Sequence, residues 1–159
     1  MIQFKALLSS LQTEGVSFVI IGGVAATLHG AARVTFDLDV VYDRSSENLE
    51  RIVRALAPFQ PYLRGAPPGL PFKFDSETLK RGLNFTLTTS EGPIDLLGEL
   101  TGVGSFYEVS ANSVTAQLFG AEYRFIDLDA LIASKRAAGR PKDFEAIAEL
   151  ETIKQERKA

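Results

Sequence analysis

Hydrophobic residues in the first dozen positions recur at the spacing of an amphipathic helix. Phe4, Leu7, Leu8 and Leu11 stand at i, i+3, i+4 and i+7, and this spacing places their side chains on one helical face. The same reasoning, with caps and stops, predicts further helices. They cover residues 24–28, a segment from Ser45 or Ser46 to Pro58, a segment from Asp127 or Asp129 to about Ala138, and the chain after Pro141.

Short runs of β-branched and aromatic residues predict strands in the centre of the chain. They cover residues 16–21, 34–42, 83–88 and 93–97, with weaker candidates at 107–109, 114–118 and 123–126. The turn at 90–92 predicts a hairpin, whereas residues 58–74 are rich in Pro and Gly and predict a loop or insertion. Helices early and late around central strands indicate an α/β (α+β) protein with a mixed sheet.

Length and composition narrow the class of protein. The 159 residues predict one domain over residues 1–150 and a helical tail over 151–159 that frays. Seventeen Lys and Arg against twenty Asp and Glu leave a net charge of −3, which excludes a protein whose main role is coating nucleic acid. The most apolar stretch, residues 16–28, is too short to span a bilayer. We therefore expect a cytoplasmic protein with no membrane partner.

The scarcity of nitrogen and sulfur ligands limits the possible metal sites. The chain has no cysteine and a single histidine, His29, which excludes disulfides, thiolate zinc sites, cysteine nucleophiles and histidine-rich metal sites. We expect His29 to be a packed or solvated residue at a helix end. Any metal is therefore expected to be held by oxygen atoms.

Two aspartates stand two residues apart in a predicted strand. Asp37 and Asp39 would point to the same face, because side chains at i and i+2 of a strand share a face. Neighbouring carboxylates repel each other, and a cation between them relieves the repulsion. Oxygen ligands of this kind suit Mg²⁺. The alternative is an edge strand that carries two solvated aspartates.

Two other features support a site at this place. Gly22 and Gly23 lie where a predicted strand gives way to a helix, and glycines there let the backbone approach an anion closely; the alternative is a simple tight turn. Asp95 stands among apolar neighbours in a later strand. A buried carboxylate needs a partner or a metal, although Asp95 could instead lie on the surface of an edge strand.

A basic segment follows near the end of the chain. Lys135 continues the apolar stripe of its predicted helix, so its amine either reaches inward toward an anion or extends past the core edge to solvent. Arg140 and Lys142 follow the helix and either contact phosphates or lie in a solvated turn. Asp143 is expected to favour a helix N-terminus or to orient Lys135 or Arg140.

These residues together resemble a known family. The glycine pair, the stretch 30–40 with its two aspartates, and Asp95 are similar to the nucleotidyltransferase superfamily typified by DNA polymerase beta. Within it, the chain most resembles the bacterial subgroup related to abortive-infection type IV toxin nucleotidyltransferases, which residues 135–143 also resemble. The resemblance covers about residues 1–150 and implies a nucleotidyltransferase-like mixed β-sheet flanked by helices.

The resemblance also implies a role for each residue. A nucleoside triphosphate such as ATP would bind with Mg²⁺, held through Gly22, Gly23, Arg33, Thr35, Lys135 and Arg140. The catalytic and metal-binding residues would be Asp37, Asp39 and Asp95. An acceptor oxygen would attack the α-phosphorus and release pyrophosphate, while paired metals stabilise the entering and leaving oxygens.

Three functions remain open at this point. The first is a Mg²⁺-dependent nucleotidyltransferase acting on a tRNA, protein or small-molecule acceptor, in a toxin–antitoxin or defence context with an antitoxin partner. The second is a non-catalytic nucleotide-binding or partner-binding relative, whose structural signature would be loss of Asp95 from the metal site. The third is another enzyme that uses two aspartates, such as a nucleotide-sugar glycosyltransferase, against which the placement of Gly22 and Gly23 argues.

Overall fold

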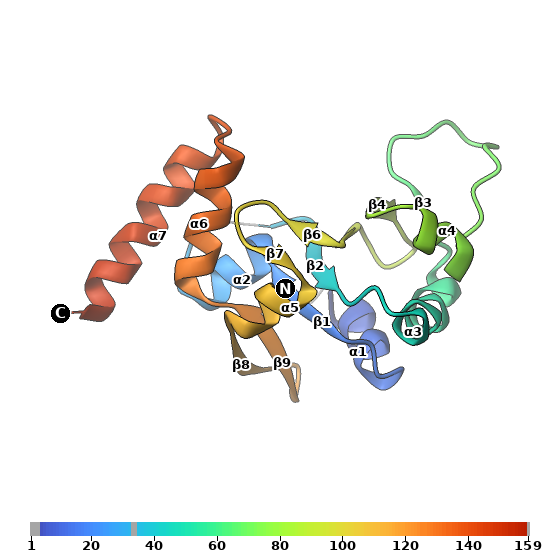
Figure 1. Cartoon of the computed structure of the whole chain (residues 1–159), viewed down its shortest axis with the longest axis horizontal. Coiled ribbons are helices and arrows are strands. Elements are labelled where there is room, and N and C mark those ends of the chain that lie inside the picture. Colours follow the sequence, from blue (N-terminus) through green and yellow to red (C-terminus); the bar gives the residue numbers. More distant parts are fainter. Residues whose placement is uncertain (1–3, 33–34, 159) are drawn as a thin grey trace.

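The computed structural model describes residues 4–32 and 35–158. Within this range the chain forms a mixed seven-stranded sheet in the order β3-β4-β5-β2-β1-β9-β8, flanked by helices (Figure 1). Its strands are β1 (Phe18–Ile21), β2 (Leu38–Tyr42), β3 (Tyr62–Leu63), β4 (Asn84–Thr88), β5 (Ile94–Leu97), β8 (Ser113–Leu118) and β9 (Ala121–Ile126). A separate small hairpin pairs β6 (Glu99–Leu100) with β7 (Gly104–Ser105).

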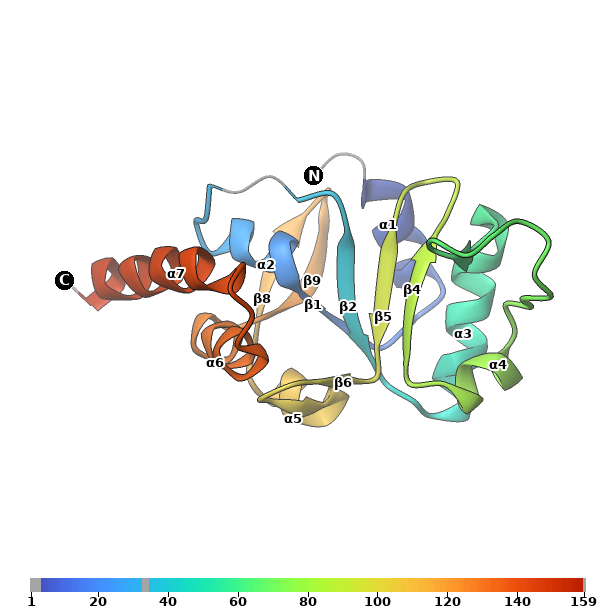
Figure 2. The same cartoon turned by 90° about the horizontal axis from the view of Figure 1, so that it is seen from above.

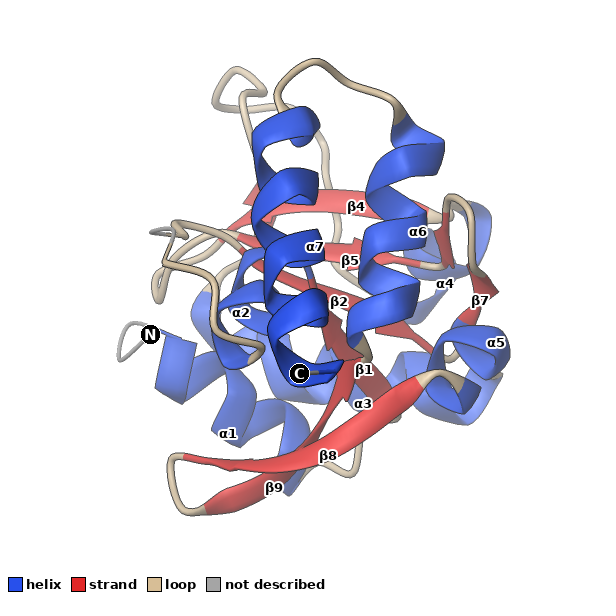
Figure 3. Ribbon diagram, turned by 90° about the vertical axis from the view of Figure 1, so that its left-hand side faces the viewer, coloured by secondary structure: helices blue, strands red, loops and turns tan. Residues whose placement is uncertain are grey.

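Helices lie on both faces of this sheet. They are α1 (Lys5–Thr13), α2 (Gly22–Leu28), α3 (Ser46–Leu56), α4 (Ser76–Arg81), α5 (Phe106–Ala111), α6 (Leu128–Ala138) and α7 (Asp143–Lys158), with a 3₁₀ turn η2 (Ala57–Phe59) after α3. α1, α3 and α4 pack together on one side, and α2, α6 and α7 lie on the other (Figure 2). Figure 3 shows α6 and α7 side by side in front of the sheet.

Strand β2 is the central strand of the sheet and pairs with β1 on one side and with β5 on the other. It runs antiparallel to β1, with Ile21 opposite Asp39. It runs parallel to β5, with Asp39 opposite Asp95. The end of β1 and the starts of β2 and β5 therefore meet at one edge of the sheet, where α2 begins.

The hydrophobic core lies on both faces of the sheet, with Val24 and Ala25 of α2 and Leu131 of α6 buried on one face and the α1–α3 layer packed on the other. Leu7, Leu8 and Leu11 of α1 are fully buried there, as the helical spacing predicts. Strand β4 alternates, with Phe85 and Leu87 buried and its other residues exposed. Alternation of this kind marks a strand with one covered and one open face, so the face of β4 opposite α1 and α3 is open.

Most predicted elements are confirmed, and the exceptions are short. The predicted strand at 107–109 is wrong, because these residues belong to α5; a short apolar run does not distinguish a helix from a strand. The predicted strand 34–42 begins only at Leu38. The stretch 58–74 is not a simple loop, since it contributes β3 to the sheet, and the following helix α4 was not predicted.

The C-terminal helix α7 continues to Lys158. Lys154 Nζ lies 2.9 Å from Asp129 Oδ1, and Arg157 Nη2 lies 3.1 Å from His29 Nδ1. His29 is buried, and its Nε2 lies 2.7 Å from the carbonyl oxygen of Ile126, so it packs at a helix end as expected.

The domain boundary at residue 150 and the fraying of the tail stay predictions. None of the described helices is long and apolar enough to cross a membrane.

Candidate functional site

Three carboxylates meet at the edge of the sheet where β1 ends. Asp37, Asp39 and Asp95 each offer an oxygen, and these atoms all lie within 4.8 Å of one another. Asp39 and Asp95 are opposite each other on parallel neighbouring strands. Asp37 lies in the bend just before β2 rather than inside a strand, so its place in the cluster comes from the bend and not from strand alternation.

The chemistry of this cluster fits a hard divalent cation. Burial, together with the charge of Asp95, a hydrogen bond with Asp95 and the charge of Asp37, raises the pKa of Asp39 to about 7, against the lowering effect of Arg64. Asp39 Oδ1 is buried without a hydrogen-bond partner. An all-oxygen donor set with crowded negative charge and an unpaired buried oxygen is what Mg²⁺ would satisfy.

Arg64 also belongs to this cluster, and the sequence analysis missed it. Its Nη2 lies 2.7 Å from Asp95 Oδ1 and its Nη1 lies 3.8 Å from Asp37 Oδ2. The residue follows β3 directly, and its backbone N–H donates to the carbonyl oxygen of Thr86 on β4 at 2.9 Å. Only the register of β3 on β4 brings Arg64 here, and no local signal in residues 58–74 indicates that register.

The glycine pair is explained by side chains of the protein itself. Gly22 has φ +63°, and a Cβ there would lie 2.2 Å from Asp39 Oδ2. A Cβ on Gly23 would lie 2.5 Å from Thr35 Oγ1. The glycines therefore make room for Asp39 and Thr35, a reason that the sequence analysis did not give.

The packing of Gly22 against Asp39 and of Gly23 against Thr35 does not test whether these residues contact a nucleotide. The Thr35 hydroxyl donates to the carbonyl oxygen of Asp37 at 3.1 Å, which ties Thr35 to the bend that carries the first acid. Contacts of Gly22, Gly23 and Thr35 with a nucleotide stay predictions. Arg33, for which the same contact was predicted, lies outside the described residues.

A second charged cluster lies where α6 gives way to α7. Asp143 is buried, and its carboxylate accepts a 2.8 Å hydrogen bond from Arg140 Nε while Lys135 Nζ lies 3.8 Å away. Burial acts to raise the pKa of Asp143, but the hydrogen bond and charge of Arg140 and the charge of Lys135 outweigh it and lower that pKa. Asp143 thus pairs with both basic residues and is also the first residue of α7, so both placements expected for it are found.

One pocket joins the two clusters. It has a volume of about 570 Å³ and collects residues from distant parts of the sequence. Gly22, Gly23, Asp39 and Asp95 lie on its sheet side, and Lys135 and Arg140 lie on its helix side. The remaining wall comes from the start of β4, the end of β5, the β6 strand and the inner face of α6. A ligand with a cationic end and an anionic end matches this distribution of charge.

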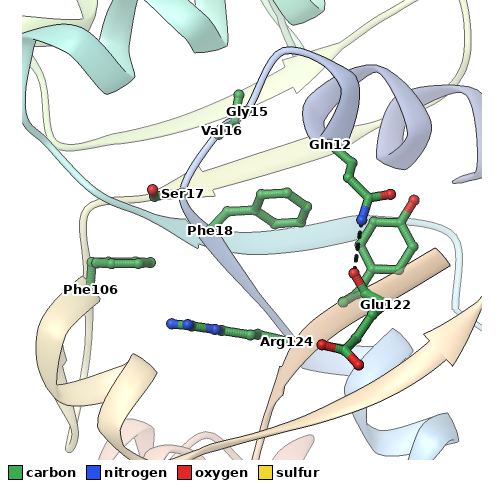
Figure 4. Close-up of a pocket in the computed structure, with 9 residues that line it drawn as sticks. Gln12, Gly15, Val16, Ser17, Phe18, Phe106, Glu122 and Arg124 are labelled. Atoms are coloured by element: carbon green, nitrogen blue, oxygen red, sulfur yellow. Dashed lines mark hydrogen bonds between the residues drawn. The ribbon is translucent and has the colours of Figure 1, made fainter.

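A smaller pocket of about 290 Å³ lies at the opposite end of β1. Figure 4 shows the rings of Phe18 and Phe106, the guanidinium of Arg124, and Gln12, whose amide donates to the carbonyl oxygen of Glu122 at 2.9 Å. Among the residues that the structure describes, the acidic cluster suited to a metal is that of the larger pocket. The larger pocket is therefore the candidate functional site.

Comparison with known proteins supports the fold. No family model matches the sequence, and no match was found among curated proteins. The structure is similar to a crystal structure described as a "putative nucleotidyltransferase" from Thermotoga maritima, with a TM-score of 0.60 and 14% sequence identity. The likeness covers 94% of this chain and 90% of the other. The predicted mixed sheet flanked by helices, of nucleotidyltransferase-like fold, is thereby confirmed.

Proposed function

We propose that the protein is a metal-dependent nucleotidyltransferase, which moves a nucleoside monophosphate from a nucleoside triphosphate to a hydroxyl acceptor. One observation carries this proposal: Asp37, Asp39 and Asp95 converge beside a pocket whose opposite wall presents Lys135 and Arg140. The pocket has the charge distribution that a metal–triphosphate pair requires. The similarity in fold to the Thermotoga maritima protein agrees with it.

Each residue takes a role that follows from its place. Asp37, Asp39 and Asp95 would hold Mg²⁺, which when bound neutralises phosphate charge and lowers the pKa of a coordinated hydroxyl. Lys135 and Arg140 bind phosphate oxygens, with Asp143 holding both in place.

The residues of the glycine turn complete this proposal. The backbone of Gly22 and Gly23 faces the phosphates, while Thr35 and Arg33 contact the nucleotide. With substrate and protein groups held in this way, catalysis consists mainly of positioning and charge stabilisation.

The acceptor would approach over the open face of β4, whose exposed Asn84 and Thr86 lie opposite Leu97 and Asp95 of β5. A tRNA end, a protein hydroxyl or a small molecule could each bring a hydroxyl there. ATP as the triphosphate, a toxin–antitoxin context and an antitoxin partner are part of the proposal and rest on the sequence resemblance.

A non-catalytic relative is the second candidate, and one observation favours it. The ion pair of Arg64 with Asp95 supplies a protein cation at the acidic cluster. The expected structural signature of a non-catalytic relative was the loss of Asp95 from the metal site. The structure does not have this signature, because Asp95 lies with the other two acids. We therefore place this candidate second.

A transfer assay tests the proposal. The protein is incubated with Mg²⁺, each of four α-³²P-labelled nucleoside triphosphates, and either total tRNA or a cell lysate, with the Asp37→Asn/Asp39→Asn double variant as the blank. Label transferred by the intact protein and not by the double variant would establish the reaction and name the base. Absence of both transfer and triphosphate binding would favour the non-catalytic candidate.

A further inference from the structure

Arg64 stands where a cation between the carboxylates would stand. Its two terminal nitrogens face different acids, with Nη2 at 2.7 Å from Asp95 Oδ1 and Nη1 at 3.8 Å from Asp37 Oδ2. The side chain is largely buried, with 29% of it exposed. Among the described arginines and lysines, Arg64 is the one with ion pairs to this cluster.

The contact of Arg64 with the acids is incomplete. A fully formed arginine–carboxylate pair has two parallel hydrogen bonds, whereas Arg64 divides its nitrogens between two acids. Its Nε is buried with no hydrogen-bond partner, and Asp95 Oδ1 faces Nη2 without the geometry of a hydrogen bond. The strong hydrogen bond of Nη2 goes instead to the carbonyl oxygen of Leu87, at 2.6 Å. The guanidinium therefore offsets part of the negative charge of the three acids without a complete set of hydrogen bonds to them.

A metal ion and the guanidinium need the same carboxylate oxygens. Mg²⁺ binds carboxylate oxygens at about 2.0–2.1 Å, so an ion held by Asp37 and Asp95 would lie against the two Arg64 nitrogens and repel them. The backbone of Arg64 is held by its hydrogen bond to Thr86, so the guanidinium would leave the acids by rotation of the side chain, which also breaks the hydrogen bond of Nη2 to Leu87.

We propose that Arg64 is a resident counter-cation that competes with the divalent metal for Asp37 and Asp95 and is displaced when the metal binds. This inference rests on the proposed function, because it assumes that the carboxylates hold a metal. The inference gives the segment 58–74 a role, because this segment carries Arg64. Arg64 would set the metal concentration at which the carboxylates bind the ion. Removing the guanidinium should therefore tighten metal binding.

The test is a titration of the intact protein with Mn²⁺, followed by electron paramagnetic resonance of the free ion. Arg64→Gln should bind Mn²⁺ about tenfold more tightly than the wild type, because one nearby positive charge is gone. Arg51→Gln removes a partly exposed arginine on α3 and should leave the affinity unchanged. A second readout is the ¹⁵N signal of Arg64 Nε, which should shift when diamagnetic Mg²⁺ is added.

The outcomes separate this inference from the proposed function. An affinity of Arg64→Gln equal to or weaker than that of the wild type would overturn the inference and leave the metal site standing. Failure of every variant to bind Mn²⁺ would overturn the proposed function itself, and the inference with it. If Arg64→Gln does not fold, Arg64→Lys serves in its place. Lysine cannot fork between two carboxylates, so Mn²⁺ should bind more tightly than to the wild type, and an unchanged affinity would again contradict the inference.

Discussion

The two ends of the large pocket have opposite imbalances of charge. Among the residues that the structure describes, three carboxylates at the sheet end face one guanidinium, that of Arg64. At the helix end, Lys135 and Arg140 share the single carboxylate of Asp143. Counted over these described residues, neither cluster is neutral by itself, so each lacks a partner of the sign that the other has in excess. A cation bound to an anion, as in a metal–triphosphate complex, supplies both partners at once.

The two ends are also built in different ways. The acidic end depends on the register of β2 on β5 and of β3 on β4, which joins residues far apart in sequence. The basic end forms within one short stretch, where α6 ends at Gly139 with φ +62° and α7 begins at Asp143. A substitution at the acidic end should therefore disturb several elements, and one at the basic end should act locally.

The largest effect is expected from Asp39→Asn. Burial is the largest cause of the raised pKa of Asp39, and its Oδ1 has no hydrogen-bond partner, so loss of its charge should weaken Mn²⁺ binding on the order of a thousandfold. The measurement is the same Mn²⁺ titration, with label transfer as a second readout. Asp129→Asn removes an exposed acid that pairs with Lys154 and should change neither. Unchanged Mn²⁺ affinity in Asp39→Asn would remove Asp39 from the metal site.

Gly22→Ala should have the next largest effect. A methyl group there would lie 2.2 Å from Asp39 Oδ2 and would require a left-handed backbone, so we expect about 100-fold weaker Mn²⁺ binding and a free energy of unfolding lower by about 1–3 kcal/mol. Gly120→Ala is the matched control, because Gly120 has φ +78° and nothing within 4 Å of its added Cβ. Equal metal affinity in the two variants would show that the clash with Asp39 does not matter.

The acidic end should also make stability depend on pH. The pKa of Asp39 is raised from 3.8 to about 7, so the folded state binds this proton more tightly than the unfolded state does. Between about pH 4 and pH 7 the contribution of Asp39 to the free energy of unfolding should therefore fall as pH rises, by roughly 3 kcal/mol. Urea denaturation in a chelator measures the change, and saturating Mg²⁺ should reduce it.

The variant Asp39→Asn isolates this contribution. Asp75, Asp129 and Asp143 have lowered pKa values, and their contributions rise with pH, opposite in sign to that of Asp39. The informative quantity is the difference in the free energy of unfolding between the wild type and Asp39→Asn. A difference that stays constant from about pH 4 to pH 8 would contradict a raised pKa at Asp39.

The contrast between the two ends also explains what the sequence could predict. Helical spacing placed Lys135 on the inner stripe of α6, and local signals placed that helix from Asp127 or Asp129 to about Ala138, because these signals lie within a few residues of each other. The acids were recognisable as residue types in strand-like surroundings. Their convergence depends on strand register, which no local pattern contains.

Arg64 shows the limit of sequence reasoning most clearly. The Pro and Gly content of residues 58–74 correctly indicates turns, but the two-residue strand β3 inside it is too short to have a period of its own. The sequence pattern therefore could not predict the pairing of β3 with β4. For the same reason it could not predict that Arg64 lies beside the acids. The short helices α4 and α5 were missed for the same reason, since each has a single buried residue.

The smallest effect is expected at the basic end, from Lys135→Ala. Lys135 is mostly buried, its side chain 19% exposed, beside the pocket and 3.8 Å from Asp143, so its loss should weaken triphosphate binding about tenfold and leave nucleoside binding unchanged. Equilibrium binding of labelled triphosphate and of the matching nucleoside measures both. Lys154→Ala, which removes a lysine paired with Asp129 on the far part of α7, should affect neither ligand. Equal losses for the two ligands in Lys135→Ala would mean that the lysine supports the pocket wall through Asp143 and does not contact phosphate.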